Sequence, residues 1–317
     1  MYRRLSTIAT LVLLFAFALR GASRTETAVP ALELFDRTNL VAWCIVPFDA
    51  KKRTPEQRAE MLQRLGFRYL AYDYRPEHIQ TFDAEILALK RRGIEMFAWW
   101  FPGELNAEAR GILEILKRHR IRPQLWVSGG GEPVSGSSAR ALRIEAEAAR
   151  IRPIAEAAAE IGCAVALYNH GGWFGEPENQ VAIIRHLRPM GFTNVGVVYN
   201  LHHGHEHIDR FAAILETIKP HLLALNLNGM QRGGDRKGNK ILPLGQGELD
   251  EYYLRTISKS GWHGPIGVLN HTDEDAEARL QDNLDGLEWL VQRLQGEATL
   301  PRPKPRSWRG PVISTAD

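Results

Sequence analysis

The sequence is poor in cysteine. Its 317 residues include only two, Cys44 and Cys163. Both fall in predicted strands, given below, that would face each other across a barrel. A disulfide cannot form over such a separation without backbone movement, so we expect both cysteines to be small, buried, apolar residues.

The chain has little net positive charge, and all of it lies in the first residues. The formal net charge is +3, and Arg3, Arg4 and Arg20 account for it, because no acidic residue precedes Glu26. Without residues 1–23 the chain is close to neutral. Nucleic-acid binding depends on a basic surface, so we expect no nucleic-acid partner.

The apolar run near the N-terminus is too short to span a bilayer. It extends from Ile8 to Leu19, follows two arginines and precedes the small residues 21–23. This layout predicts a secretory signal over residues 1–23, and hence a secreted or periplasmic protein with no stable membrane insertion after cleavage. The alternative is a permanent N-terminal anchor. No cysteine lies near the expected cleavage site, so a lipid anchor is not expected.

Short apolar stretches recur along the chain with helical stretches between them. This alternation is typical of βα units and a parallel sheet. Eight units predict a single-domain α/β fold, a (β/α)8 TIM barrel over residues 36–295, followed by a proline-rich tail over 296–317. A doubly wound open sheet is the alternative, but no Gly-rich phosphate loop follows the first strand. The predicted strands are Leu40–Val46, Phe67–Asp73, Ile94–Trp100, Ile121–Val127, Cys163–Asn169, Asn194–Asn200, Leu222–Asn228 and Ile266–His271.

Helix boundaries are marked by capping residues. Thr54 with the following proline predicts the start of the first helix, and Asp83 and Asn106 are predicted caps of the second and third. A long Ala-, Glu- and Arg-rich segment, Ser137–Ile161, predicts the fourth helix. We expect Pro153 to bend or split it.

Polar residues gather where the predicted strands end, which is the part of a TIM barrel that carries catalytic groups. Strand five is followed by Tyr-Asn-His-Gly-Gly-Trp and strand six by Leu-His-His-Gly-His. His170 and His203 are candidate bases near neutral pH, with Asp73 and Glu248 as reserve acids or bases. A loop histidine can equally be a solvated side chain, but histidines in three loops of one rim favour a functional interpretation.

Amides and aromatic rings at the same strand ends are candidate substrate ligands. Asparagine amides can stabilise an enolate oxygen, although asparagine also closes turns. Aromatic faces suit the C–H-lined faces of sugar rings, although Trp43 and Trp99 can equally fill barrel layers. The predicted substrate-binding residues are Asn200, Asn226, Asn228, Asn270, His271, Trp100, Trp126, Trp173 and Gln246.

These residues give the chain a family resemblance. It resembles the xylose-isomerase-like barrel superfamily of sugar isomerases, epimerases, dehydratases and apurinic endonuclease relatives. Three stretches carry the resemblance: Tyr-Asn-His-Gly-Gly-Trp, Val-Tyr-Asn-Leu-His-His-Gly-His, and Leu-Pro-Leu-Gly-Gln-Gly-Glu-Leu-Asp from Leu242 to Asp250. The branch that it resembles is secreted and sugar phosphate isomerase or epimerase-like. The resemblance implies a small-molecule carbohydrate substrate.

The resemblance also implies a divalent cation at four strand ends. Family members hold it with carboxylates and a histidine. The corresponding positions here are Tyr168, Asn200, Asn226 and Asn270. Neutral amides cannot offset the dehydration of a divalent cation, so no cofactor is expected. The alternative is a rearranged site in which His170 and His203 bind zinc or another transition metal.

We therefore expect an enzyme that removes a proton next to the carbonyl of a sugar or keto-sugar, by isomerisation, epimerisation or β-elimination, without the usual cation. The alternative is a non-catalytic carbohydrate-binding barrel. An endonuclease requires a metal cluster and a basic groove, and the sequence has neither. The loop 229–247 carries Arg232, Arg236 and Lys237, which either reach an anionic group or are solvated. The oligomeric state is left open.

Overall fold

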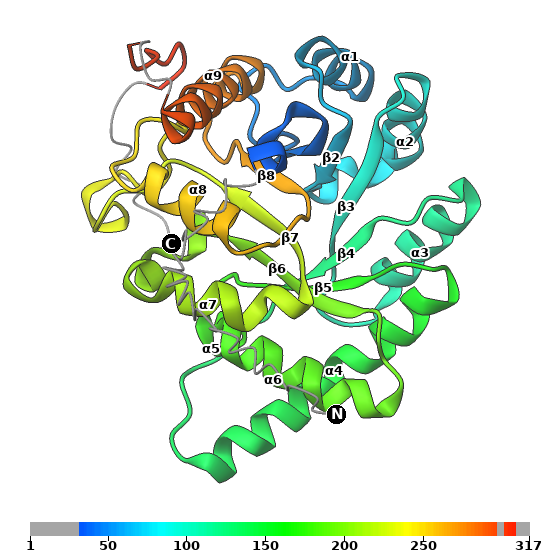
Figure 1. Ribbon diagram of the computed structural model, residues 1–317. Coiled ribbons are helices and arrows are strands. Elements are labelled where there is room, and N and C mark those ends of the chain that lie inside the picture. The colour runs from blue at the N-terminus through cyan, green and yellow to red at the C-terminus, as the bar shows by residue number, and fades with distance from the viewer. Residues whose placement is uncertain (1–31, 297–300, 309–317) are drawn as a thin grey trace, which may run out of the picture.

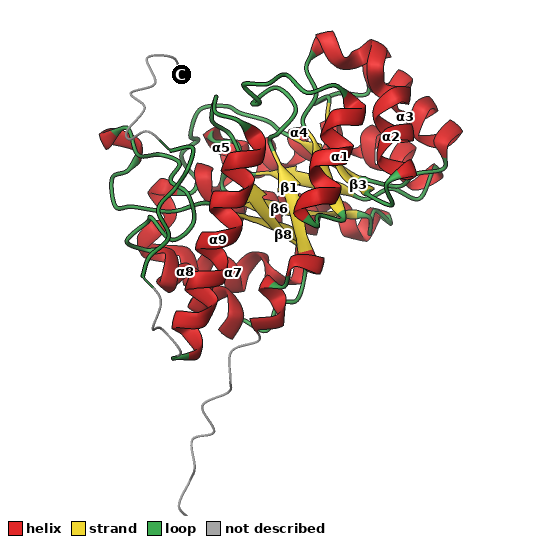
Figure 2. Ribbon diagram, turned by 90° about the horizontal axis from the view of Figure 1, so that it is seen from above, coloured by secondary structure: helices red, strands yellow, loops and turns green. Residues whose placement is uncertain are grey.

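Eight parallel strands close into a barrel with helices outside it (Figures 1 and 2). The computed structural model describes residues 32–296 and 301–308, so the predicted signal segment lies outside the described residues. Each strand pairs with the next, and the eighth pairs with the first. This closure confirms the TIM barrel and rules out the open sheet. The strands are β1 (Leu40–Trp43), β2 (Tyr69–Tyr72), β3 (Glu95–Phe101), β4 (Gln124–Val127), β5 (Val165–Tyr168), β6 (Val195–Asn200), β7 (Leu222–Leu227) and β8 (Ile266–Leu269).

Helices cover the outer face of the barrel. They are α1 (Pro55–Leu65), α2 (Phe82–Arg91), α3 (Ala107–His119), α4 (Ser137–Glu160), α5 (Gly172–Gly175), α6 (Pro177–Leu187), α7 (Phe211–Ile218), α8 (Asp250–Lys259) and α9 (Ala276–Gln295). Two predicted caps are confirmed: Thr54 forms a capping box with Gln57, and the Asn106 side chain accepts from the Ala109 N–H. Among the described helices, none is long and apolar enough to cross a membrane.

The predicted cap of α2 and the predicted split of α4 are wrong. Asp83 does not cap α2, because the cap position is Thr81; Asp83 instead pairs with Arg118 and His119 at the end of α3. Pro153 does not split α4, which runs unbroken through it. Apolar residues on both sides of the proline, Ile151 among them, are buried and hold the two halves together.

The barrel interior is filled by large rings opposite small residues. Trp43 and Trp126 meet with their ring centroids 4.0 Å apart, and small residues such as Ala71 and Ala98 make room around them. Gly267 is required here, because a Cβ atom at this position would lie 2.3 Å from the Trp43 ring. Cys44 lies in this interior and Cys163 in the outer core, and both are buried and free, as expected.

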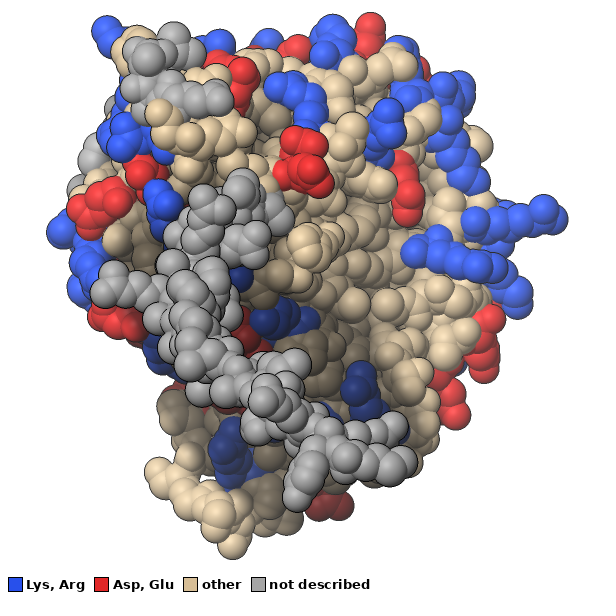
Figure 3. Space-filling view, viewed as in Figure 1, with Lys and Arg blue, Asp and Glu red and all other residues tan. Residues whose placement is uncertain are grey.

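Charged side chains of both signs lie on the outer surface. On the face drawn in Figure 3, acidic side chains are interspersed among the basic ones. Some of these charges connect neighbouring helices, as Glu56 of α1 does with Arg91 of α2. The mixed surface accords with the near-neutral charge of the chain beyond residue 23, and the expected lack of a nucleic-acid partner stays a prediction.

The described part of the tail, residues 301–308, packs against α9. The Asp282 carboxylate accepts hydrogen bonds from the backbone N–H groups of Arg306 and Ser307 and from the Ser307 hydroxyl. The Pro303 carbonyl accepts from Gln246 in the loop after β7. These contacts tie the tail, α9 and that loop into one unit.

Candidate active site

The carboxyl ends of β5 and β6 are joined by an amide side chain. Asn169 Oδ1 accepts the Asn200 N–H at 2.7 Å, and Asn169 Nδ2 donates to the Asn200 carbonyl at 3.1 Å. The two-point contact fixes the ends of both strands. Asn169 was missed as a site residue, although its position between Tyr168 and His170 in the polar loop could have indicated it.

A buried chain of hydrogen bonds links the ends of three neighbouring strands, β5, β6 and β7. Asn226 Nδ2 donates to Asn200 Oδ1 at 2.8 Å, and Asn200 Nδ2 donates to the Tyr168 hydroxyl at 2.7 Å. The His202 N–H also donates to Asn200 Oδ1. Burial raises the pKa of Tyr168 well above its usual value, so the phenol stays neutral.

This chain does not fit the divalent cation that the resemblance implies. Its groups are neutral, and Asn200 Oδ1 already accepts two hydrogen bonds. The fourth position, Asn270, uses its Nδ2 to donate to the Phe48 carbonyl. Hard cations need several oxygen ligands, carboxylates above all. In the part of the chain that the structure describes, no three His, Cys, Asp or Glu side chains are grouped to hold a metal ion.

Four histidine rings from three loops form a continuous cluster at the mouth. The centroids of His170 and His203 are 4.3 Å apart, those of His203 and His202 are 4.3 Å apart, and those of His202 and His271 are 5.2 Å apart. The ring of His271 also lies 3.9 Å from Phe48. The predicted convergence of His170, His203 and His271 is therefore present, and His202 is an unpredicted member.

All four histidines of the cluster are held neutral. Burial lowers the pKa of His203 to about 2 and that of His271 to about 4, with Lys240 and Arg75 among the positive neighbours that contribute. Burial also puts the pKa of His202 well below its usual value. His170 is the exposed member, and partial desolvation lowers its pKa. The imidazoles can therefore donate and accept hydrogen bonds, but they are weak bases at neutral pH.

Asp73, directly after β2, has the opposite shift. It is 1% exposed, and burial raises its carboxyl pKa to about 7, against the opposing effect of Arg75. Oδ1 accepts the Val46 N–H at 3.3 Å, whereas Oδ2 is buried with no hydrogen-bond partner. Burial keeps the pKa of Cys44, a residue with a φ of 56°, well above its usual value, so it stays a thiol. The negative charge of the same carboxyl also raises the pKa of this thiol.

Other polar atoms near the strand ends are buried without partners. Asn228 and Asn270 each donate through Nδ2 to backbone carbonyls. Buried polar groups in folded proteins are normally paired. A polar ligand that forms hydrogen bonds with the unpaired atoms would therefore gain binding free energy. The unpaired atoms include His202 Nδ1 and the Oδ1 atoms of Asn226, Asn228 and Asn270.

The predicted aromatic residues differ in how far they are exposed. Trp100 is half-buried and meets Trp43, Trp126 and Tyr168 edge to face. Trp126 points into the filled barrel and Trp173 packs into the outer core, and neither offers an open face. Their side-chain directions follow from the barrel register and from the fold of α5 back onto the loop after β4.

Gln246 and Glu248 point to other parts of the molecule. Gln246 donates to the tail at Pro303, and Glu248 is exposed and accepts the Arg232 N–H. In the described structure their hydrogen bonds therefore do not join the histidine cluster. The loop takes this path because the buried Asp250 accepts backbone N–H groups of Met230, Gly245 and Gly247.

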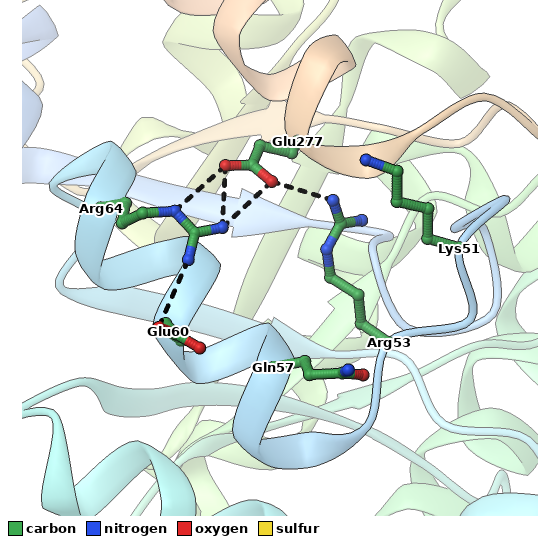
Figure 4. A pocket seen from close by; sticks show the side chains of 6 residues that line it. All are labelled: Lys51, Arg53, Gln57, Glu60, Arg64 and Glu277. Atoms are coloured by element: carbon green, nitrogen blue, oxygen red, sulfur yellow. Dashed lines mark hydrogen bonds and ion pairs between the residues drawn. The ribbon is translucent and has the colours of Figure 1, made fainter.

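A separate surface pocket, of about 490 Å³, lies between α1 and the start of α9. In Figure 4, Glu277 lies between Arg64 and Arg53 and bonds to both. Arg53 also pairs with Asp49 and Asp275. Because these charges compensate one another, the pocket is best described as an ion-pair network that joins the first and last helices.

Comparisons with known proteins agree with the fold. The model of a family described as xylose isomerase-like TIM barrel matches residues 47–293. No curated protein matches the chain.

Three solved structures illustrate the similarity. The 3-keto-D-glucoside 4-epimerase YcjR from E. coli is 15% identical with a TM-score of 0.56, covering 80% of this chain and 98% of its own. The IOLI protein with a bound zinc atom is 14% identical with a TM-score of 0.62, covering 81% and 99%. A D-psicose 3-epimerase in the presence of D-fructose is 15% identical with a TM-score of 0.55, covering 82% and 100%. With the closed barrel, the family match shows that this chain belongs to the xylose isomerase-like TIM barrel family.

Proposed function

We propose that this protein is a sugar isomerase or epimerase in which Asp73 transfers the proton next to a substrate carbonyl. The observation that carries the proposal is a buried carboxyl whose pKa is raised to about 7 and whose Oδ2 has no partner. An acid–base group works best when its pKa lies near the working pH. Asp73 can therefore take up and return a proton under neutral conditions.

Neutral groups at the other strand ends suit the other half of the reaction. When a base removes the proton, the electron pair moves onto the carbonyl oxygen, and hydrogen-bond donors stabilise the resulting enolate. His202, His203 and the strand-end amides are such donors. We assign His170 and His203 this role, because burial lowers the pKa of both rings, that of His203 to about 2, and makes them poor bases at neutral pH.

The substrate class is proposed from the relatives. Two structural neighbours are a 3-keto-D-glucoside 4-epimerase and a D-psicose 3-epimerase. A keto-sugar has the acidic C–H next to a carbonyl that the proposed step requires. No step is assigned to the usual cation, because the strand-end groups do not fit it.

Solvent exchange tests the proposal. The protein, the keto-sugars D-fructose and D-psicose and a 3-keto-glucoside would be incubated in D₂O, and deuterium at the carbon next to the carbonyl would be followed by NMR. We expect exchange in the wild type and at least about a hundredfold slower exchange in Asp73→Asn, the usual contribution of an acid–base group. Glu56→Gln, which changes a surface carboxylate on α1, is the matched control. Equal exchange in wild type and Asp73→Asn would overturn the assignment.

A non-catalytic carbohydrate-binding barrel is the second candidate. The amides that replace the family's carboxylates support it, because amides bind sugars without activating a C–H bond. This candidate predicts calorimetric binding of the same sugars with no deuterium incorporation and with unchanged affinity in Asp73→Asn.

We also propose that the protein acts outside the cytoplasm. The support is the signal-like pattern of residues 1–23 in the sequence. Expression of the full chain in a bacterial host, followed by fractionation and N-terminal sequencing, tests it. A new N-terminus near residue 24 in the periplasm or medium is expected, and an uncleaved cytoplasmic protein would contradict it.

A further inference from the structure

We infer that the Tyr168 hydroxyl donates a hydrogen bond to the carbonyl oxygen of the substrate and stabilises the enolate that forms there. The inference rests on the proposed function, because it names the group that meets the oxygen when Asp73 removes the neighbouring proton. It follows from the direction of the buried hydrogen-bond chain at the ends of β5, β6 and β7.

A backbone group fixes the direction of this chain. The His202 N–H can only donate, and it donates to the Asn200 side chain at 3.1 Å. The atom that receives it is therefore the amide oxygen, Oδ1, and the amide nitrogen lies 2.7 Å from the Tyr168 hydroxyl. Asn226, which lies opposite Asn200 in the register of β6 and β7, donates to the same oxygen at 2.8 Å. Two donors thus hold Asn200 in one orientation.

The proton of the Tyr168 hydroxyl is available to a ligand. An amide N–H can only donate, so the hydroxyl oxygen is the acceptor in its bond to Asn200 and its own O–H is directed elsewhere. In the part of the chain that the structure describes, no group accepts this O–H. Successive hydrogen bonds polarise one another, so the chain strengthens its last donor. Burial raises the pKa of the phenol well above its usual value, and the proton therefore stays on the oxygen.

Tyr168 lies across the barrel from Asp73. Its ring belongs to the cluster inside the barrel, with centroid distances of 5.7 Å to His170 and 5.5 Å to His203. Strand β5, which ends at Tyr168, is separated from β2 by β3 and β4 in the closed barrel. A sugar at the mouth therefore has the base on one side and the hydroxyl on another. Enolisation requires this, because the C–H bond that breaks and the carbonyl oxygen point in different directions.

The step balances with these two groups. The Asp73 carboxylate takes the proton of the C–H bond, the electrons of that bond form a C=C bond, and one pair of the C=O bond moves to the oxygen. The Tyr168 hydroxyl donates to this oxygen and keeps its proton. Return of the proton from Asp73, or of a deuteron exchanged from solvent, restores the carbonyl.

Tyr199 offers a matched control. It is fully buried on β6, and its hydroxyl bonds to His207 at 2.9 Å in the outer core of the protein. Tyr199→Phe therefore removes a buried, hydrogen-bonded hydroxyl that does not face the barrel interior. A general loss of stability or order from such a deletion should be seen in both phenylalanine variants, whereas a loss at the carbonyl should be seen only in Tyr168→Phe.

Two measurements on the full chain test the inference. The first is deuterium exchange of a 3-keto-glucoside in D₂O. Tyr168→Phe should be slower than the wild type by at least about a hundredfold, the usual effect of removing one oxyanion donor, and Tyr199→Phe should keep the wild-type rate. The second is the carbon-13 resonance of the bound ketone, labelled at the carbonyl carbon. It should move downfield in the wild type, because a hydrogen bond polarises the C=O bond, and Tyr168→Phe should lose this displacement.

A protein with 3-fluorotyrosine in place of Tyr168 retains the O–H and should retain both effects. If it loses them as Tyr168→Phe does, the O–H is not their source and the inference fails. A bound carbonyl resonance that is the same in the wild type and Tyr168→Phe would also overturn it.

The outcomes separate this inference from the proposed function. Slow exchange in Asp73→Asn with wild-type exchange in Tyr168→Phe would leave the proposed function standing and contradict the inference. A displaced resonance that depends on Tyr168, with no exchange in any protein, would support the hydrogen bond and contradict the proposed reaction.

Discussion

Replacing Asp73 with asparagine should change how the stability of the protein depends on pH. In the folded state the pKa of this carboxyl is about 7, against a reference value of 3.8. Because the folded pKa is the higher one, folding favours the protonated form. Above pH 3.8 the unfolded chain is ionised while the folded chain resists ionisation. The wild type therefore loses stability as the pH rises, until the folded carboxyl ionises near pH 7.

The size of the effect follows from the shift. Each pH unit between the two pKa values lowers the free energy of unfolding by about 1.4 kcal/mol. Between about pH 5 and pH 8 the titration spans about two units, so the wild type should lose about 3 kcal/mol from this group. The asparagine side chain of the variant cannot ionise, so the variant does not lose this stability as the pH rises. Any fixed cost of the amide, such as an unpaired N–H, is the same at every pH.

Urea unfolding of both proteins at pH 5, 6, 7 and 8 measures the difference. The free energy of unfolding of Asp73→Asn minus that of the wild type should rise by about 3 kcal/mol from pH 5 to pH 8. Other buried carboxyls, such as Asp250, are present in both proteins and cancel. Glu56→Gln removes an exposed carboxylate whose pKa is lowered by Arg91, so its difference from wild type should be flat over this range.

A difference for Asp73→Asn that is equally flat would refute the raised pKa and, with it, the assigned acid–base role. A rising difference should be accompanied by a proton-exchange rate that increases through pH 7 in the wild type. The two measurements report the same ionisation, one through folding and one through chemistry.

Two further predictions concern the scaffold. Asp282→Ala should remove the acceptor of the tail's N–H and hydroxyl groups. Urea unfolding should then show a free energy of unfolding that is lower by about 2–3 kcal/mol. A change below about 0.5 kcal/mol would show that the tail contacts add no stability. Gly267→Ala places a methyl group 2.3 Å from Trp43 and 2.6 Å from Asn226 Oδ1. The free energy of unfolding should therefore fall by about 1–3 kcal/mol, and the thermal midpoint should fall with it. An unchanged midpoint would contradict the described packing.

The barrel could be predicted because its signals are local. Alternating apolar and helical stretches, and caps such as Thr54 and Asn106, depend on neighbours in the chain. The errors came from long-range contacts. The direction of Trp126 depends on the register of the closed barrel, and the path of the loop carrying Gln246 depends on Asp250 and on a tail that returns more than 50 residues later.

In the candidate site, too, the sequence gives the residue types, whereas the pKa of each side chain depends on contacts made in the folded protein. The sequence predicted that His170, His203 and His271 meet at the mouth, because strand ends of a TIM barrel share one rim, but it did not predict His202. It could not predict which of them exchanges protons. Isolated histidine is a better base than isolated aspartate at neutral pH, and on that ground His170 and His203 ranked first. Burial disfavours the charged form of either group, so it lowers the pKa of His203 to about 2 and raises that of Asp73 to about 7. The order of basicity is thereby reversed, which is why Asp73→Asn discriminates between the two assignments better than any histidine variant.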